Sequence, residues 1–235
     1  MMRISAAEFA QRRHALMAQM SPNSALLLPA AEQLYRNATV EHVYRQDSNF
    51  QYLSGFPETE AFLLLLPGRA EGEYVLFCRD RDPERELWEG RRAGQEGAQA
   101  NYGVDQAFSI NKIDQLLPDL IAGRERLYYP VGQSTALDTQ VMGWVNKLRA
   151  RVRLGVQPPQ EFVALEPLLH EMRLIKSAAE IDMLRYAAQV SARAHVSAME
   201  ASRAGLYEYH LEAELDYEFR KGGAKMPAYG SIVAA

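Results

Sequence analysis

Histidines and carboxylates at helical spacing are the first residues in this chain to consider for chemistry. His210 and Glu214 are four residues apart, so on a helix they share one face and could bind a metal ion together. Two ligands do not complete a metal site, and further carboxylates lie nearby at Glu208, Glu212 and Glu218. We therefore interpret the segment as a solvated acidic helix. A substrate-facing role at its start is the alternative.

The other ionisable candidates favour structural roles. His195 lies on an apolar helical stripe, which is typical of a hydrogen-bonded core histidine rather than a catalytic base. His170 and Glu171 receive the same interpretation. Cys78 ends an apolar strand, so we predict a buried structural thiol rather than a nucleophile. The sequence also lacks a Gly-rich phosphate loop, an HExxH motif, paired cysteines and a Gly-x-Ser-x-Gly elbow.

The stretch ELWEGRRAG, residues 86–94, is less ordinary. A tryptophan beside two arginines in a Gly-flanked polar loop makes a poor core segment and a good recognition tip. The arginines could clamp a carboxylate, and the indole of Trp88 could stack on an apolar or proline-like group. Alternatively, Trp88 anchors its own loop or a subunit contact. The residues alone leave both interpretations open.

Composition argues against several kinds of partner. The chain has 235 residues, 48% hydrophobic and 24% charged, as in ordinary soluble globular proteins. Its net charge of −4 gives no electrostatic argument for a nucleic-acid or membrane partner. Arg149, Arg151 and Arg153 alternate, which is typical of one solvated strand face. A single cysteine and the absence of an apolar N-terminal signal predict a cytoplasmic location.

Hydrophobic periodicity predicts an α/β domain over the first 160 residues. Ser5 and Glu8 form a capping-box pattern at the start of a helix. The stretch 31–59 shows few periodic cues, and we interpret it as a long loop. The predicted strands are 24–30, a hairpin formed by 60–68 and 72–80, and 126–132. The further predicted helices are 108–123 and 134–150.

The sequence becomes helical after a proline-containing break at 155–162. A second capping box, Ser177 with Glu180, starts a long helix that we expect to end near Gly205, and a second helix stops at Gly222. The final YGSIVAA, residues 229–235, is predicted to be a strand. Because an apolar strand with no polar residue after it is an unusual end for a domain, we expect the chain to be the front part of a longer protein.

Five of these stretches, in order, resemble the Xaa-Pro aminopeptidases (aminopeptidase P), in particular the bacterial form. They are YRQDSNFQYLSGFPETEA (44–61), LWEGRRAG (87–94), HEMRLIKSAAEI (170–181), EYHLEAELDYEF (208–219) and PAYGSIVA (227–234). The resemblance implies a creatinase-like α/β domain at 1–173, followed by an incomplete pita-bread metallopeptidase (M24) domain at 174–235.

The resemblance also implies an activity. Family members remove an N-terminal residue that precedes proline, and they use two Mn²⁺ ions that activate a shared water molecule and stabilise the oxyanion. They form homo-oligomers, dimers or tetramers. The implied substrate is a peptide that begins Xaa-Pro, and neither nucleic acid nor membrane is an expected partner.

The family's metal ligands and proton-shuttling histidines come after the SIVA strand, so the resemblance assigns no catalytic or metal-binding residue to this chain. It does imply substrate-binding roles for three others. Trp88 matches a tryptophan that reaches a neighbouring subunit's active site, Tyr229 matches a tyrosine near the substrate cleft, and Arg153 has the weakest local match. We expect these 235 residues alone to be inactive. The alternatives are a non-enzymatic creatinase-like module for oligomerisation or protein binding, and a related prolidase or creatinase.

Overall fold

The computed structural model describes residues 4–233. These residues form two compact units, one of Ser5–Leu174 and one that begins at Ile175 and also includes Ile4. None of the helices in the described part of the chain is long and apolar enough to cross a membrane.

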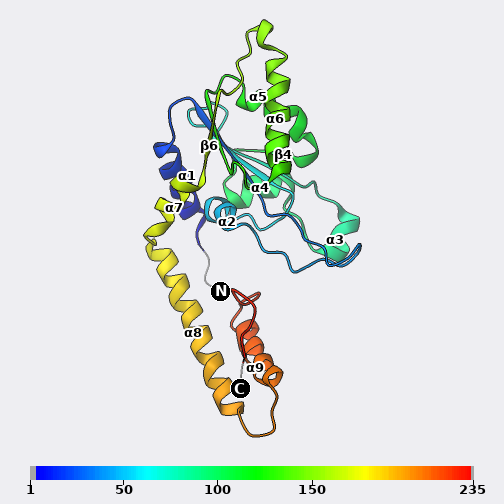
Figure 1. Ribbon diagram of the computed structural model, residues 1–235, viewed down its shortest axis with the longest axis vertical. Coiled ribbons are helices and arrows are strands. Elements are labelled where there is room, and N and C mark those ends of the chain that lie inside the picture. Colours follow the sequence, from blue (N-terminus) through cyan, green and yellow to red (C-terminus); the bar gives the residue numbers. More distant parts are fainter. Residues whose placement is uncertain (1–3, 234–235) are drawn as a thin grey trace. The chain divides into compact units, whose positions relative to one another are not determined.

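A six-stranded mixed sheet is the centre of the first unit (Figure 1). Its strand order is β4-β3-β2-β1-β5-β6. The β1–β2 and β2–β3 pairs are antiparallel, and the other three pairs are parallel. The strands are β1 (Ser24–Pro29), β2 (Phe62–Leu65), β3 (Tyr74–Cys78), β4 (Gln106–Ser109), β5 (Arg126–Tyr129) and β6 (Glu161–Ala164).

Helices cover both faces of this sheet. In Figure 1, α5 and α6 lie on one side, and α1 and α7 lie on the other. The helices of the unit are α1 (Ala6–Gln19), α2 (Ser48–Ser54), α3 (Pro83–Glu89), α4 (Gly94–Tyr102), α5 (Ile113–Ile121), α6 (Thr135–Arg149) and α7 (Glu166–Leu174), with short 3₁₀ turns η1 (Ile110–Lys112) and η2 (Val152–Leu154).

Successive strand residues alternate between two hydrophobic cores. Leu26 packs in the core beside α1 and α2, whereas Leu27 packs in the core beside α5 and α6. Leu63 and Leu64 of β2 divide in the same way. Because successive side chains of a strand point to opposite faces, a strand buried on both faces has a continuous apolar sequence. The predicted α/β class, the strand at 24–30 and the hairpin are therefore confirmed.

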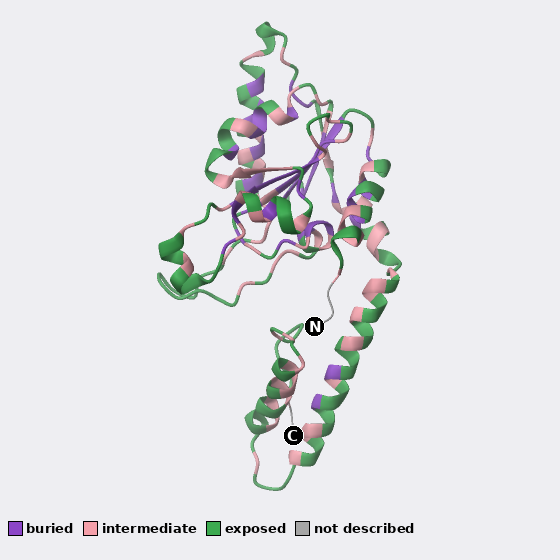
Figure 2. Ribbon diagram, turned by 180° about the vertical axis from the view of Figure 1, so that it is seen from behind, coloured by how far each residue is buried: buried purple, intermediate pink, exposed green. Residues whose placement is uncertain are grey.

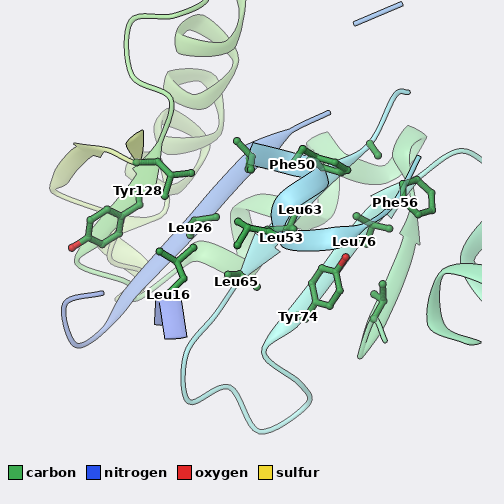
Figure 3. Packing of buried hydrophobic residues seen from close by; sticks show 14 of the residues in the cluster. Leu16, Leu26, Phe50, Leu53, Phe56, Leu63, Leu65, Tyr74, Leu76 and Tyr128 are labelled. Carbon is green, nitrogen blue, oxygen red and sulfur yellow. The ribbon is translucent and has the colours of Figure 1, made fainter. Parts of the chain in front are cut away.

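The predicted loop at 31–59 is wrong in one part, because it contains α2. The Asp47 side chain accepts hydrogen bonds from the backbone N–H groups of Asn49 and Phe50, which caps the helix start. Gly55 ends the helix with a φ of 63°. Figure 3 shows Phe50 and Leu53 lying over the sheet beside Leu63. The helix has only seven residues, too few for a periodic signal.

The predicted helix at 108–123 begins later than expected. Phe108 belongs to β4 and pairs with Phe77, so the α-helix starts only at Ile113. Pro118 lies inside α5 and cannot donate to the carbonyl of Asp114. The Lys147 Nζ donates to that carbonyl instead, at 2.7 Å, and the Trp144 Nε1–H donates to the Asp114 carboxylate at 2.7 Å. The predicted helix at 134–150 is confirmed as α6.

The alternating arginines do not share a strand face. Arg149 ends α6, and Arg153 lies in η2, so the segment turns instead of extending. The C-terminal end of a helix favours basic residues because they complement its exposed carbonyl groups, which accounts for Arg149 without any strand.

The second unit contains α8 (Ala178–Ala201) and α9 (Glu208–Lys221). The predicted capping box is present, with Ser177 Oγ accepting from the Glu180 N–H and the Glu180 carboxylate accepting from the Ser177 N–H. However, α8 ends at Ala201, and Gly205 lies in the connection to α9. The Tyr186 hydroxyl donates to the Gly222 carbonyl at 2.8 Å and joins the two helices.

The predicted strand at the end of the chain is absent from its described part, residues 229–233. A strand requires hydrogen bonds to a neighbouring extended segment, and the described residues of this unit otherwise form helices and turns. Residues 234 and 235 lie outside the described residues.

Candidate functional site

Trp88 lies at the end of a short helix, not in a loop. The predicted loop 86–94 is wrong in its first half, because Glu86–Glu89 continue α3, which ends at Gly90 with a φ of 86°. The Trp88 side chain is 90% exposed. An indole is rarely so exposed, so the structure does not support the alternative in which Trp88 anchors its own loop.

The two arginines after Trp88 have different environments. Arg91 is exposed, whereas Arg92 is only 9% exposed. Arg92 Nη2 donates to the Glu89 carboxylate at 2.6 Å, and its Nη1 donates to the Asp80 carbonyl at 3.4 Å. Arg92 therefore makes contacts within the protein, and the pair does not form the predicted clamp for an external carboxylate.

Further apolar side chains are exposed beside α3, in the segment 34–43 (Figures 1 and 2). A β-bridge between Tyr35 and Glu41 closes this segment. The Glu41 carboxylate, with smaller contributions that include Glu89 of α3, raises the pKa of Tyr35. Large apolar residues are exposed here at Leu34, Tyr35, Val40 and Val43, and on α3 at Leu87 and Trp88.

Arg153 is exposed on η2, and no other side chain in the described part of the chain forms an ion pair or hydrogen bond with it. The segment that follows α6 lies at the opposite end of the first unit from α3 (Figure 1). The structure therefore does not bring Trp88 and Arg153 together within one copy of this unit.

Tyr229 lies in the second unit and lines an open pocket of about 550 Å³. Residues of α8, α9 and the segment 222–233 form its walls, which include Val190, Leu215 and Phe219. The Tyr229 side chain is 76% exposed. The tyrosine thus lies at the edge of an apolar hollow within that unit.

The histidines have local structural roles. His195 is exposed, so the predicted core position is wrong, although its Nδ1 lies 2.8 Å from the Ser191 carbonyl as expected for a hydrogen-bonded histidine. The buried positions of α8 are Val190 and Ala194, and Ala194 directly precedes His195. His210 Nδ1 accepts from the Tyr207 N–H at 3.0 Å and caps α9.

Metal ligands do not gather in the described residues. Among residues 4–233 no group of three or more His, Cys, Asp or Glu side chains is placed to hold a metal ion. His210 caps α9, and its ring lies tilted against that of Tyr209, with ring centroids 4.3 Å apart. The side chains of residues 4–233 therefore do not form a metal centre.

Cys78 is fully buried, as predicted. Burial raises the pKa of its thiol to about 12. A thiol with so high a pKa is a poor nucleophile near neutral pH, because the thiolate is the reactive form.

Sequence reasoning missed a network of charged side chains around α3. It comprises Glu58, Arg79, Glu89 and Arg92, and part of it lines a pocket of about 560 Å³. The spacing of Glu89 and Arg92, three apart, was a local signal for an ion pair. The partners Glu58 and Arg79 come from distant segments, and no periodic pattern indicates them.

Two family models match this chain. The model described as "Aminopeptidase P, N-terminal domain" matches residues 9–128, and that described as "Metallopeptidase family M24" matches residues 182–235. The chain belongs to the aminopeptidase P family. Its first match lies in the six-stranded sheet unit, and its second lies in the α8–α9 unit.

Curated relatives share sequence with almost the whole chain. The Xaa-Pro aminopeptidase of Escherichia coli is 42% identical over 100% of this chain and 54% of its own length. That of Haemophilus influenzae is 37% identical over 97% of this chain and 50% of its own length. Human Xaa-Pro aminopeptidase 3 is 32% identical over 98% and 47%. The chain therefore spans about half the length of the curated relatives it matches.

Solved structures of the aminopeptidase P family have the same fold. The aminopeptidase PepP of Pseudomonas aeruginosa superposes with a TM-score of 0.98 at 65% identity, over 100% of this chain and 53% of that chain. A zinc-substituted Escherichia coli aminopeptidase P in complex with product gives a TM-score of 0.92 at 42% identity, over 97% and 52%. The predicted fold, a mixed-sheet domain followed by the start of an M24 domain, is confirmed.

Proposed function

We propose that this chain is part of an Xaa-Pro aminopeptidase. Such an enzyme hydrolyses the first residue from peptides that have proline as the second residue. The observation that supports this most strongly is the continuous match to proteins of that name across both units, over 97% or more of the chain. A module kept only for binding would need just the first unit, whereas the M24 model also matches the second.

The proposed activity requires a metal centre that the described residues do not supply. The description of the M24 family as metallopeptidases implies a divalent metal. We propose two Mn²⁺ ions, held by ligands outside the described residues, and we propose that these 235 residues alone do not hydrolyse peptides. Bound metal ions would supply an activated water and charge stabilisation. The residues present would contribute substrate binding and assembly.

Three residues are proposed to bind substrate. Trp88 would bind substrate in a neighbouring subunit's cleft, and Tyr229 would bind it in the cleft of its own subunit. Arg153 is the third proposed residue, and its local sequence match is the weakest. The exposure of Trp88 supports this, since an exposed indole is a frequent anchor in protein interfaces. Trp88 and Arg153 lie at opposite ends of one unit, so a cleft that uses both would need residues of two copies. We therefore propose a homo-oligomer, a dimer or a tetramer.

The remaining proposals concern organisation and location. The domain division is proposed to fall between residues 173 and 174, close to the end of the compact unit Ser5–Leu174. The protein is proposed to act in the cytoplasm on peptides, with neither nucleic acid nor membrane as a partner. Its net charge of −4 is consistent with this.

A chimera tests the proposed function. These 235 residues would replace the matching half of the Pseudomonas aeruginosa aminopeptidase, which is 65% identical to them. With Mn²⁺, we expect the chimera to release the first residue from an Xaa-Pro peptide and to leave an Xaa-Ala peptide intact. The 235-residue chain alone should release nothing. A folded chimera without Xaa-Pro activity would contradict the proposal, as would turnover by the chain alone.

Variants of the chimera test the proposed site. Trp88→Ala should raise KM about tenfold or more, as expected for loss of an interface aromatic. Leu87→Ala is the matched control, since Leu87 is also exposed on α3. If both variants have the KM of the parent chimera, Trp88 does not bind substrate.

A further inference from the structure

Helix α3 has no apolar anchor. It has seven residues, none of them buried, and Leu87 and Trp88 are 81% and 90% exposed. Isolated helices shorter than about 12 residues are marginal in water, and most helices of proteins are held by an apolar face packed on the core. Some other interaction must therefore hold α3 in place.

Local capping starts the helix but does not orient it. The Asp82 side chain accepts from the Arg85 N–H at 3.2 Å, and Pro83 occupies the first helical turn. Both contacts lie within residues 82–85. They favour helical backbone angles there and leave the direction of the helix relative to the sheet open.

Ion pairs at the other end connect α3 to the body of the unit. Glu89 directly follows Trp88 in the chain, and its carboxylate accepts a hydrogen bond from Arg92 Nη2 at 2.6 Å. The same oxygen lies 3.8 Å from Arg79 Nη1, and Arg79 directly follows β3. Arg92 also donates to the Asp80 carbonyl at 3.4 Å. The last residue of α3 is thus bound to two arginines that belong to the body.

The network continues into the body of the unit. Arg79 Nη2 lies 3.5 Å from Glu58 Oε2, an ion-pair distance, and Glu58 Oε1 accepts from the Ala93 N–H at 2.6 Å. The Glu58 side chain is only 13% exposed. On the preceding turn of α3, Glu86 binds Arg81 through both carboxylate oxygens.

These contacts differ from ordinary surface ion pairs, whose net contribution is close to zero. Arg92 is buried, so removal of Glu89 would leave an inward-facing guanidinium short of a partner, which is costly. The hydrogen bond from Arg92 also holds the pKa of Glu89 below its ordinary value. By contrast, the Arg85–Asp82 pair spans 3.6 Å between two exposed side chains of the same region.

We propose that Arg92 and Glu89 are positioning residues that hold α3 in one orientation and thereby keep Trp88 ordered before it meets a neighbouring subunit. The inference deepens the proposed function and rests on the proposed role of Trp88. An ordered indole loses less conformational entropy on binding than a mobile one, so the network would favour association without touching substrate.

Nuclear magnetic resonance of the 235-residue chain tests the positioning. The chain has two tryptophans, Trp88 and the buried Trp144, so its indole groups give two signals. We expect the backbone amide of Trp88 to have an order parameter near 0.85 in the native chain, and below about 0.6 in Arg92→Gln and Glu89→Gln. Arg85→Gln is the matched control and should keep the native value.

Trp144 serves as an internal reference for folding. Its Nε1–H donates to Asp114, far along the chain from α3, and its signal should be unchanged in every variant. Arg92→Lys keeps the charge but not the forked donor, so it should recover only part of the order. If Arg92→Gln loses the Trp144 signal, that variant does not fold, and the order of Trp88 in Glu89→Gln then decides the test. Glu89 is the more exposed partner, so its replacement disturbs the fold less. Native order of Trp88 in folded Glu89→Gln would overturn the proposal.

Different experiments would contradict the positioning role of Glu89 and Arg92 and the proposed substrate-binding role of Trp88. In the chimera, Glu89→Gln should raise KM with kcat unchanged, because only the availability of Trp88 is altered. If Trp88→Ala has no effect on KM, the role of Trp88 fails while the order measurement still decides the positioning. If Trp88→Ala raises KM and Glu89→Gln changes neither KM nor the order parameter, the positioning alone fails.

Discussion

Cys78 illustrates how burial determines the chemistry of a single residue. The thiol ends β3 inside the core formed by the strands with α1 and α2, and its Sγ lies 3.9 Å from Gln95 Nε2. Burial disfavours the thiolate and raises the pKa of the thiol to about 12. Cys78 therefore contributes to packing, and folding suppresses the ionisation of its thiol.

We expect Cys78 to react with Ellman's reagent at about pH 8 only as fast as the chain unfolds, and at once in denaturing urea. An unfolded thiol has a pKa of about 8.5. Between that value and about 12, the unfolded state binds fewer protons than the folded state, so the free energy of unfolding should fall as pH rises. Urea midpoints across this pH range would measure the fall, and Cys78→Ala should reduce it. Rapid labelling of the native chain would contradict the burial.

The burial of Arg13 is a residue-level feature that the sequence does not indicate. An arginine is usually exposed, yet Arg13 is buried, donates to the Leu53 carbonyl at 2.9 Å and lies 4.0 Å above the Tyr74 ring. Desolvation lowers its pKa. Both partners are more than 30 positions away in sequence. Residue type alone predicts an exposed arginine, so only the tertiary fold reveals this contact.

At the scale of elements, long periodic segments were predictable and short ones were not. Helices α1, α6, α8 and α9 have enough turns for an apolar stripe or a cap to indicate them. Helices α2 and α3 have seven residues each and depend on Asp47 and Asp82 as caps. The predicted strand near Ile232 is absent for another reason: its residues favour strands, but no neighbouring strand pairs with them within residues 4–233. For the site, an exposed recognition role of Trp88 was one of two interpretations that its residues left open, whereas the ion pairs around α3 required the structure.

The capping box of α8 should contribute measurably to stability. Ser177→Ala removes the acceptor for the Glu180 N–H and should destabilise α8 by about 1 kcal/mol. Ser197→Ala, inside the same helix, is the control and should be neutral or slightly stabilising, because alanine has the higher helix propensity. Urea unfolding followed by far-ultraviolet circular dichroism would compare them. Equal midpoints for both variants would show that the cap does not matter.

Over the whole molecule, the two units bury very different amounts of apolar surface. The four central strands β1, β2, β3 and β5 are buried along most of their length, whereas α8 and α9 are mainly exposed or half-buried (Figure 2). Among the described residues from 175 onward, only Val190 and Ala194 are buried. Since burial of apolar surface is the main stabilising contribution, the second unit should be the less stable one.

Hydrogen exchange of the 235-residue chain should reveal this difference. We expect the backbone amides of β2 and β3 to exchange slowest, because both strands are central and buried. Amides of α9 and of the segment 224–233 should exchange quickly. Mass spectrometry of peptides after timed exchange would measure both. Protection of α9 equal to that of β2 would show that the second unit is stable by itself.

The strand order also has a consequence for synthesis on the ribosome. The strands β2, β3 and β4 each pair with the strand before them, β5 then pairs with the free edge of β1, and β6 pairs with β5. No strand has to insert between two that are already paired. The sheet can therefore grow outward at its edges while the chain is still emerging, and each addition buries apolar surface at once. Such stepwise growth leaves few long-lived open edges for aggregation.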